Sequence, residues 1–427
     1  MARRFGRTRA KTPAPEALQP ELTPDDSGNV YAQARQQGHV VDRRAQVLFV
    51  AAIVLVIVYL VGLVVPKNLF YTALHQSGTN NGYTFAWFVS DFTENINGLV
   101  GVLAGNEAGA GFASTMILFV IVAMTGAAMA LSGAVYQGTF RNALVTPSTL
   151  GVMTGASLGM ALWVVFIYDE DKAGGSWFAD ANSSGSFDLG SYLMSSFGYA
   201  LCCFAGCLFV VGVVLLVIRL TNHGSLSGIL MIITGQVVGG IMGAITNTLR
   251  YYYVTVDPDG QKATLLQELQ ISSFFRSFTL VDVAVVGLAL LATFAVVMHY
   301  RSQLTLLSFS EAEARSLGVE TRRVRFSVIA LCTLLTAIVV SFCGHVGFVG
   351  FLVPHMARRL VGPDFKYLLP CSLLLGAVFV LASYILVWVT LGSGYLTMCG
   401  MYISIFGAAV FLVTALKGDG GARGEFH

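Results

Sequence analysis

The sequence contains too little charge for a water-soluble fold. Only 11% of its 427 residues are Asp, Glu, Lys or Arg, whereas 55% are hydrophobic and the mean hydropathy is +0.72. Soluble domains carry about 25% charged residues. The apolar residues form runs of about 20, the length of a membrane-crossing helix, and the short alternating segments typical of membrane β-strands are lacking. These features predict an all-α, polytopic membrane protein.

A disulfide framework and a secretory signal are also lacking. The seven cysteines lie inside apolar segments, at Cys202, Cys203, Cys207, Cys332, Cys343, Cys371 and Cys399. Cys203 and Cys207 share a helix face, which suits a metal or redox pair, but packing of small side chains in a membrane helix is the favoured interpretation. Residues 1–42 are polar and contain no apolar signal core, so the first span is expected to direct the chain to the membrane.

Motifs for nucleotide binding and catalysis are missing as well. The sequence contains no G-x-x-x-x-G-K-[ST] and no H-E-x-x-H, and no motif pairs a nucleophile with a base. The chain is therefore expected to have no catalytic residue, no metal site and no cofactor of its own, and not to be an enzyme.

Ten segments are long enough and apolar enough to be membrane helices. They comprise residues 45–65, 113–137, 148–168, 197–219, 228–250, 279–299, 325–344, 346–360, 367–390 and 395–416. The eighth is short and is expected to be a partial or tilted helix. The expected organisation is a disordered cytoplasmic tail over 1–44, a transmembrane domain over 45–416 and a cytoplasmic tail over 417–427.

The charge distribution predicts the orientation. With ten spans both termini share one side, which carries 20 Lys/Arg and 11 Asp/Glu; the opposite side carries 5 and 12, and together these account for all 25 basic and 23 acidic residues. Basic loops lie on the cytoplasmic side, so both termini are predicted to be cytoplasmic. Because almost no charge remains within the membrane, a secondary transporter coupled to protons or ions is the less favoured alternative.

The external side is expected to carry three longer connections, residues 66–112, 169–196 and 251–278. Within the first, Tyr83–Gly105 is half apolar and contains Asp91 and Glu94. This composition favours a helix at the membrane interface over a span.

A chain reversal is predicted within Thr125–Gly159, TGAAMALSGAVYQGTFRNALVTPSTLGVMTGASLG. Small residues such as Gly133 permit close helix packing. The residues that can cap free carbonyls or open the next helix are Gln137, Arg141, Asn142, Pro147 and Ser148. A tight cytoplasmic turn between two helices is expected here.

A charged stretch, Leu304–Gly318, follows the sixth span. Ser310 can cap a short helix whose first turn holds Glu311 and Glu313, where carboxylates suit the positive helix end. Gly318 is expected to end this helix. A short cytoplasmic helix, predicted within 308–323, suits a cleft on another protein; an ordinary solvated loop is the alternative.

The third stretch is Gly344–Pro370, GHVGFVGFLVPHMARRLVGPDFKYLLP. Its first three glycines, the last of them Gly350, are expected to form a sharp external turn. Pro354 is expected to break the following helix, with His355 and Arg358 bonding to the carbonyls so released. His355 could bind a metal, but no second ligand lies nearby on a shared helix face. A structural role for His355 is therefore favoured.

Together the three stretches resemble the FecCD-type permeases, which import ferric siderophores, haem or vitamin B12. The resemblance covers roughly residues 45–416 and implies a type II ABC importer permease fold. The matching motif residues are Gly133, Gln137, Asn142, Pro147, Gly151, Gly344, Gly347, Pro354, His355 and Arg358. The residues matching the segment that couples to the ATPase are Glu311, Ala314, Arg315, Leu317 and Gly318. The family's cytoplasmic gate corresponds to Ser225, Leu226 and Ser227, where a plain polar turn is the alternative.

The resemblance also implies partners. A second permease subunit is expected, as a homodimer or heterodimer with the pathway at the interface. Two cytoplasmic ATPase subunits would carry ATP and Mg²⁺, and a substrate-binding protein would dock outside. Membrane lipid surrounds the chain, and no nucleic-acid partner is expected. An iron-siderophore chelate is the favoured substrate, with haem or a corrinoid as alternatives.

The external arginines typical of the family are missing. The family opens its second span with an R-x-P-R-type pair where this sequence has Gly111–Met116, GFASTM, and ends its ninth in A-D-x-x-x-R where it has Ala382–Val387, ASYILV. Those arginines commonly pair with glutamates of the binding protein. Either a different second permease carries them, or the binding protein docks by another surface, such as residues 66–112 and 251–278; the second is slightly favoured.

Overall fold

The computed structural model describes most of the chain. The described residues are 24–64, 93–98, 100–102, 107–168, 197–221, 228–256, 262–263, 265–267, 273–274, 278–309, 314, 316–318, 320–344, 346–391 and 398–418. Within them the backbone is helical apart from short connections and an isolated antiparallel bridge between Ser273 and Gly344. The prediction of an all-α fold is confirmed.

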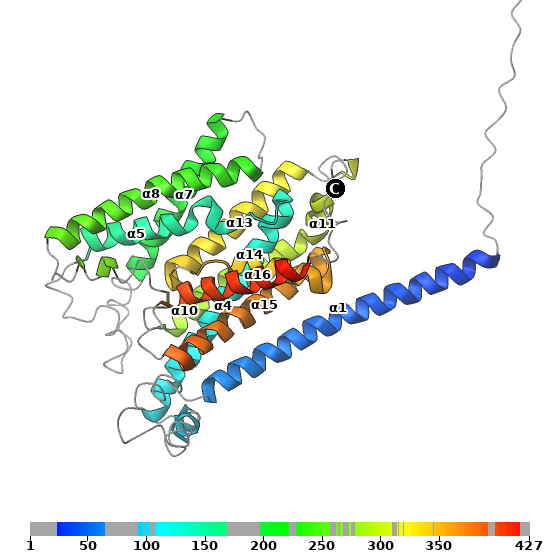
Figure 1. Cartoon of the computed structure of the whole chain (residues 1–427), viewed down its shortest axis with the longest axis horizontal. Helices are drawn as coiled ribbons and strands as arrows, with labels where there is room; N and C mark the ends of the chain where they lie inside the picture. The colour runs from blue at the N-terminus through cyan, green and yellow to red at the C-terminus, as the bar shows by residue number, and fades with distance from the viewer. Residues whose placement is uncertain are drawn as a thin grey trace, which may run out of the picture. The chain divides into compact units, whose positions relative to one another are not determined.

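The helices of Figure 1 coincide with the predicted spans. In chain order they are α1 Pro24–Val64, α4 Glu107–Phe140, α5 Val152–Phe166, α7 Gly198–Thr221, α8 Gly228–Val256, α10 Leu280–His299, α13 Thr321–Cys343, α14 Val349–Val361, α15 Phe365–Leu391 and α16 Cys399–Gly418. Among the described residues, seven helices are long and apolar enough to cross a membrane, and α5 and α16 contain shorter apolar stretches. α14 has 13 residues, so the eighth segment is a short helix, as expected.

Two helices begin earlier than predicted. α1 begins at Pro24, so residues 24–44 are helical rather than a disordered tail; this stretch contains Ala, Gln and Arg, which favour helices. α4 begins at Glu107, within the predicted external connection. The predicted interfacial helix Tyr83–Gly105 lies mostly outside the described residues, which include helical stretches at 93–98 and 100–102.

A further helix, α11 (Arg301–Phe309), follows α10 after a break at Tyr300. Leu304 and Leu307 are buried, and α11 packs on α4 and α15. α11 precedes the short helix predicted within 308–323 and was not predicted.

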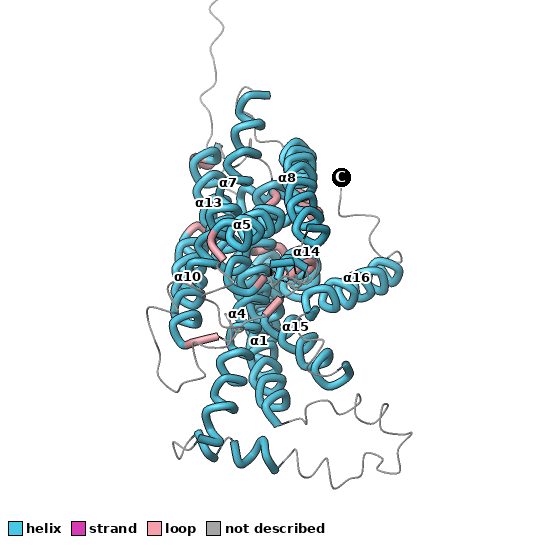
Figure 2. The backbone as a smooth tube through the Cα atoms, turned by 90° about the vertical axis from the view of Figure 1, so that its left-hand side faces the viewer, coloured by secondary structure: helices cyan, strands magenta, loops and turns pink. Residues whose placement is uncertain are grey.

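α4 is the central helix of the bundle. It contacts α10, α11, α13, α14 and α15, and Figure 2 shows it lying between α10 and α15. Gly126 of α4 and Gly376 of α15 lie so close that a Cβ on either would overlap the backbone of the other. These glycines therefore allow α15 to pack on α4 at backbone distance, which is the use of small residues in membrane helices.

α5, α7 and α8 form a second group, drawn in teal and green in Figure 1. Gly155 and Gly159 of α5 meet the backbone of α7 at Gly206 and Cys202. α13 contacts α4, α5 and α7, so it joins this group to the helices around α4.

Candidate functional site

The turn after α4 is built by Asn142. Its backbone N–H donates to Gln137 O at 3.1 Å, and its Oδ1 accepts from the N–H of Leu144 at 2.9 Å. Arg141 just before it has a left-handed φ of 50°. The backbone N–H and the side-chain oxygen of Asn142 thus satisfy one backbone group on each side of the reversal, in line with the predicted turn.

Pro147 opens the next helical element, as predicted, but this element is a 3-10 helix, η1 (Pro147–Leu150). Thr149 Oγ1 donates to Thr146 O at 2.6 Å, and the hydroxyls of Thr146 and Ser148 lie 2.7 Å apart. Gly151 then takes a left-handed φ of 80° before α5 begins at Val152. Glycine is required at this junction because other residues avoid that conformation.

The connection from α13 to α14 turns back into the bundle. Ser132 Oγ of α4 donates to Cys332 O at 3.4 Å, so Cys332 lies level with Ser132. From there α13 continues for about 16 Å to its end. The next helix nevertheless begins beside Gly133, where a Cβ would overlap the backbone of Gly350. Residues 346–348 therefore belong to a segment that returns toward the middle of α4.

The predicted external turn of Gly344, Gly347 and Gly350 is wrong in extent. Gly344 alone ends a helix, with a φ of 78°. Gly347 lies in the returning segment, and Gly350 belongs to α14, where it packs on α4. Glycine here serves close helix contact as well as turning, and the two uses look alike in a sequence.

Pro354 lies inside α14 and does not break it, so the predicted break is wrong. Pro354 has no N–H for the carbonyl of Gly350, four residues earlier. Gln137 of α4 bonds to the carbonyls there: its Nε2 lies 3.3 Å from Gly350 O and 3.1 Å from Phe351 O. Arg358 Nη1 donates to Gln137 Oε1 at 2.9 Å.

Neither His355 nor Arg358 has the predicted role as a direct carbonyl donor in the bonds found at this site. Arg358 acts on Gln137 instead, and the ring of His355 packs beside Phe411 of α16 with centroids 6.3 Å apart. The donor from α4 escaped prediction because Gln137 and Gly350 are far apart in the sequence.

A cavity of about 300 Å³ lies where these segments meet. Its lining residues are Met129, Leu144, Thr146, Pro147, Ser148, Met153, Val346, Gly347, Phe348, Gly350 and Phe351. None of them is charged, and the side-chain polar groups are the hydroxyls of Thr146 and Ser148. Two of the three predicted motifs thus come together around one apolar, hydroxyl-edged space.

The predicted coupling segment is described only in part, and none of its described residues lines this cavity. Ala314 is buried, Leu317 is 65% exposed, and Gly318 has a left-handed φ of 79°, which suits its predicted role of ending a helix. Glu311 and Arg315 lie outside the described residues. So do the predicted gate residues Ser225, Leu226 and Ser227.

Two sets of hydrogen bonds near the predicted external ends of the helices were not predicted from the sequence. Asp282 Oδ2 accepts from the N–H and hydroxyl of Thr279 at 2.8 and 2.9 Å, a capping box at the start of α10; the spacing Thr-x-x-Asp was a readable signal. Ser273 Oγ accepts from the N–H of Gly400 at 2.6 Å, while Phe274 N–H donates to Cys343 O at 2.9 Å.

Comparisons with known proteins agree with this architecture. The model of the FecCD transport family matches residues 112–417. The chain is 31% identical over 266 residues to the cobalamin import system permease protein BtuC of Halobacterium salinarum, covering 62% of each protein. It is 26% identical over 297 residues to the hemin transport system permease protein HmuU of Yersinia pestis, covering 70% of this chain and 80% of that one.

A solved metal-chelate-type ABC transporter in an inward-facing conformation has the same fold. It superposes with a TM-score of 0.62 at 23% identity and covers 88% of this chain and 99% of its own. The family model spans more than half of the sequence, and the relatives are named as permeases. The chain therefore belongs to the FecCD transport family and is a multi-pass membrane permease subunit of the ABC importer class.

Proposed function

We propose that this chain is the membrane-spanning half of an ATP-driven importer for an iron-siderophore-type chelate. The supporting observation is the cavity, whose walls are apolar and hydroxyl-bearing and include no charged side chain. Walls of this kind offer no ligand to a bare metal ion, which would lose its solvation there, whereas a metal whose ligands are already supplied by a chelator needs none. Haem and a corrinoid are the alternative cargoes.

The similar permeases carry names of several cargoes and do not select one of them. Their names include hemin and cobalamin systems and an Fe(3+)-citrate import permease of Bacillus subtilis. A molybdate import permease of Haemophilus influenzae is also similar. The cargo test therefore compares ferric siderophore, haem, cobalamin and molybdate.

The experiment uses proteoliposomes that contain this chain with its ATPase subunits and binding protein. ATP-dependent uptake of labelled ferric siderophore is expected, and uptake of one of the other cargoes instead would replace the proposed substrate. Replacing the Walker lysine of the ATPase should abolish uptake, and collapsing the proton gradient should leave it. Uptake that follows the gradient without ATP would favour a secondary transporter.

A buried carboxylate and a partly buried guanidinium support ATP hydrolysis on a partner subunit as the energy source. Asp282 is bonded to the backbone and hydroxyl of Thr279, and Arg358 is bonded to Gln137. Both groups serve structural bonds, whereas ion-coupled transporters use such residues to carry their coupling ion. ATP and Mg²⁺ are accordingly proposed on separate ATPase subunits.

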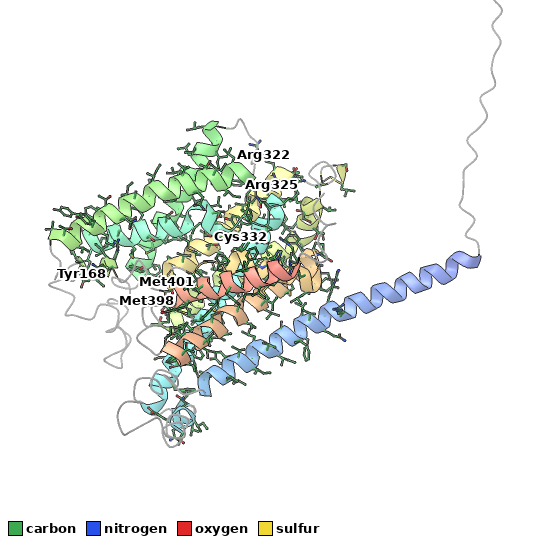
Figure 3. All side chains as sticks on the ribbon, in the orientation of Figure 1. Tyr168, Arg322, Arg325, Cys332, Met398 and Met401 are labelled. Carbon is green, nitrogen blue, oxygen red and sulfur yellow. The ribbon has the colours of Figure 1, made fainter. Side chains whose placement is uncertain are left out.

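The proposed orientation places both termini in the cytoplasm. Figure 3 shows Arg322 and Arg325 at the end of the bundle opposite Tyr168 and Met398. Positively charged residues near the ends of spans favour the cytoplasmic side, so the end with Arg322 and Arg325 is proposed to face the ATPase. The binding protein would dock at the other end.

A second permease subunit is proposed to cover α8. Ile233, Val237 and Ile241 are exposed on this helix, and a Cβ on Gly240 or Gly243 would meet no described atom within 4 Å. In a bilayer, glycines that leave such space permit another helix to approach closely.

A further inference from the structure

Gln137 is a buried amide whose bonds cross between two helices. Its residue is 2% exposed, and an amide buried among apolar side chains is costly unless its polar atoms are bonded. Its Nε2 reaches two carbonyls of α14, and its Oε1 accepts from Arg358. Gln137 therefore has both ends of its amide engaged by one neighbouring helix.

The approach of the two helices depends on glycine. Gly133 and Gln137 are four residues apart, so they share a face of α4. A Cβ on Gly133 would overlap the carbonyl of Gly350, and a Cβ on Gly350 would lie 3.0 Å from Met129 O. With no side chain at either position, the Gly350 carbonyl comes within reach of Gln137.

Pro354 explains why this carbonyl needs a donor from another helix. In a regular helix the N–H of residue 354 would bond to Gly350 O, but proline has none. The side chain of Gln137 takes that place at 3.3 Å. Arg358 fixes the orientation of the amide, because a guanidinium only donates and so requires Oε1 on its side and Nε2 on the carbonyl side.

The first turn of α14 is also one wall of the cavity, through Gly350 and Phe351. At the far end of α14, the chain turns at Gly362 into α15, whose Phe365 N–H donates to Thr305 Oγ1 of α11 at 3.2 Å. α14 thus lies between the cavity and the helix that precedes the predicted coupling segment.

We propose that Gln137 is a positioning residue for transport. It replaces the backbone donor that Pro354 lacks, and so holds the first turn of α14, with the cavity wall that this turn supplies, against α4. Arg358 positions the amide of Gln137. The effect on transport rests on the proposed importer function, whereas the effect on α14 does not.

Hydrogen–deuterium exchange on the full chain in lipid nanodiscs tests the effect on α14. In Gln137→Met, the amides of the first two turns of α14 should exchange about tenfold faster, the size expected for one lost hydrogen bond. Gln303→Met is the matched control: this residue lies on α11, and its Oε1 has no hydrogen-bond partner among the residues that the structure describes. It should leave α14 unchanged.

Restoring the backbone donor provides the decisive comparison. Pro354→Ala returns an N–H opposite Gly350 O, so the double variant Pro354→Ala/Gln137→Met should regain most of the lost protection. A packing role for Gln137 predicts no such recovery, and exchange in the double variant as fast as in Gln137→Met would overturn the proposal. If Gln137→Met does not fold, recovery of folded protein in the double variant is the expected rescue, and failure of both contradicts it.

Gln137→Glu separates the two contacts of the amide. Next to Arg358 the new carboxyl stays ionised, so it keeps the acceptor for Arg358 and loses the donor for the carbonyls. Exchange should rise as in Gln137→Met; wild-type protection would show that the Arg358 contact alone positions α14, against the proposal.

Uptake per ATP hydrolysed in proteoliposomes tests the effect on transport. It should fall in Gln137→Met and recover in the double variant, and an unchanged ratio would refute the role in transport. If the wild type shows no ATP-driven uptake, the importer function fails, while the exchange results still decide whether Gln137 replaces the missing donor.

Discussion

Gly133→Ala should destabilise the protein through a single added methyl group. The new Cβ would lie 2.7 Å from Gly350 Cα and would overlap the Gly350 carbonyl, so α14 must move away from α4. Overpacking of this kind costs about 1–3 kcal/mol, while replacing a helical glycine with alanine returns about 1 kcal/mol. The overlap with backbone is severe, so we expect a net loss of about 1–2 kcal/mol.

The assay is thermal unfolding of the purified chain in detergent, followed by loss of the folded monomer. Gly212→Ala on α7 is the matched control, because a Cβ there would meet nothing within 4 Å; it should be neutral or slightly stabilising. The lower melting temperature of Gly133→Ala should be accompanied by weaker hydrogen bonding of Gln137 to α14. Equal melting temperatures for the two variants would refute the close approach of α4 and α14.

Three further outcomes are expected. Ser273→Ala removes the acceptor for the buried N–H of Gly400 and should lower the free energy of unfolding by about 1–3 kcal/mol; a melting temperature equal to that of the wild type would contradict this tie. Cysteines placed at Leu317 and Val256, which are 65% and 64% exposed, should be labelled from opposite faces of the membrane, and labelling of both from one face would reject the ten-span topology. In a homodimer, affinity for the binding protein should depend only weakly on salt. Salt weakens binding by screening exposed charge pairs, and this chain lacks the external arginines that would form them. A steep loss of affinity with salt would indicate basic residues on a different second permease.

The helices were predictable because the bilayer imposes length and polarity on each span. Runs of about 20 apolar residues are visible without knowledge of their neighbours, and each predicted span overlaps one α-helix. α11 escaped prediction because only part of it, including Leu304 and Leu307, is buried. The apolar face of α11 is buried by packing on α4 and α15, and these contacts cannot be seen in the sequence of α11 itself.

The motif residues were found, but their contacts were not. Gln137 and Pro354 were both singled out, yet each was assigned a local role: one in the turn after its own helix, the other as a helix breaker. The prediction of a helix break at Pro354 assumed that the carbonyl four residues earlier would remain without a hydrogen-bond donor. In the folded chain Gln137, from another helix, bonds to the freed carbonyl of Gly350.

The sequence alone indicated the family, the positions of the main helices and the expected sidedness, because hydropathy, charge and short motifs are properties of neighbouring residues. The tertiary structure decided which glycines turn the chain and which bring helices together, and it decided where the returning segment after Gly344 lies. It also placed Gln137 of α4 opposite Gly350 of α14. Such contacts depend on backbones that meet only after the helices have packed, so no local pattern encodes them.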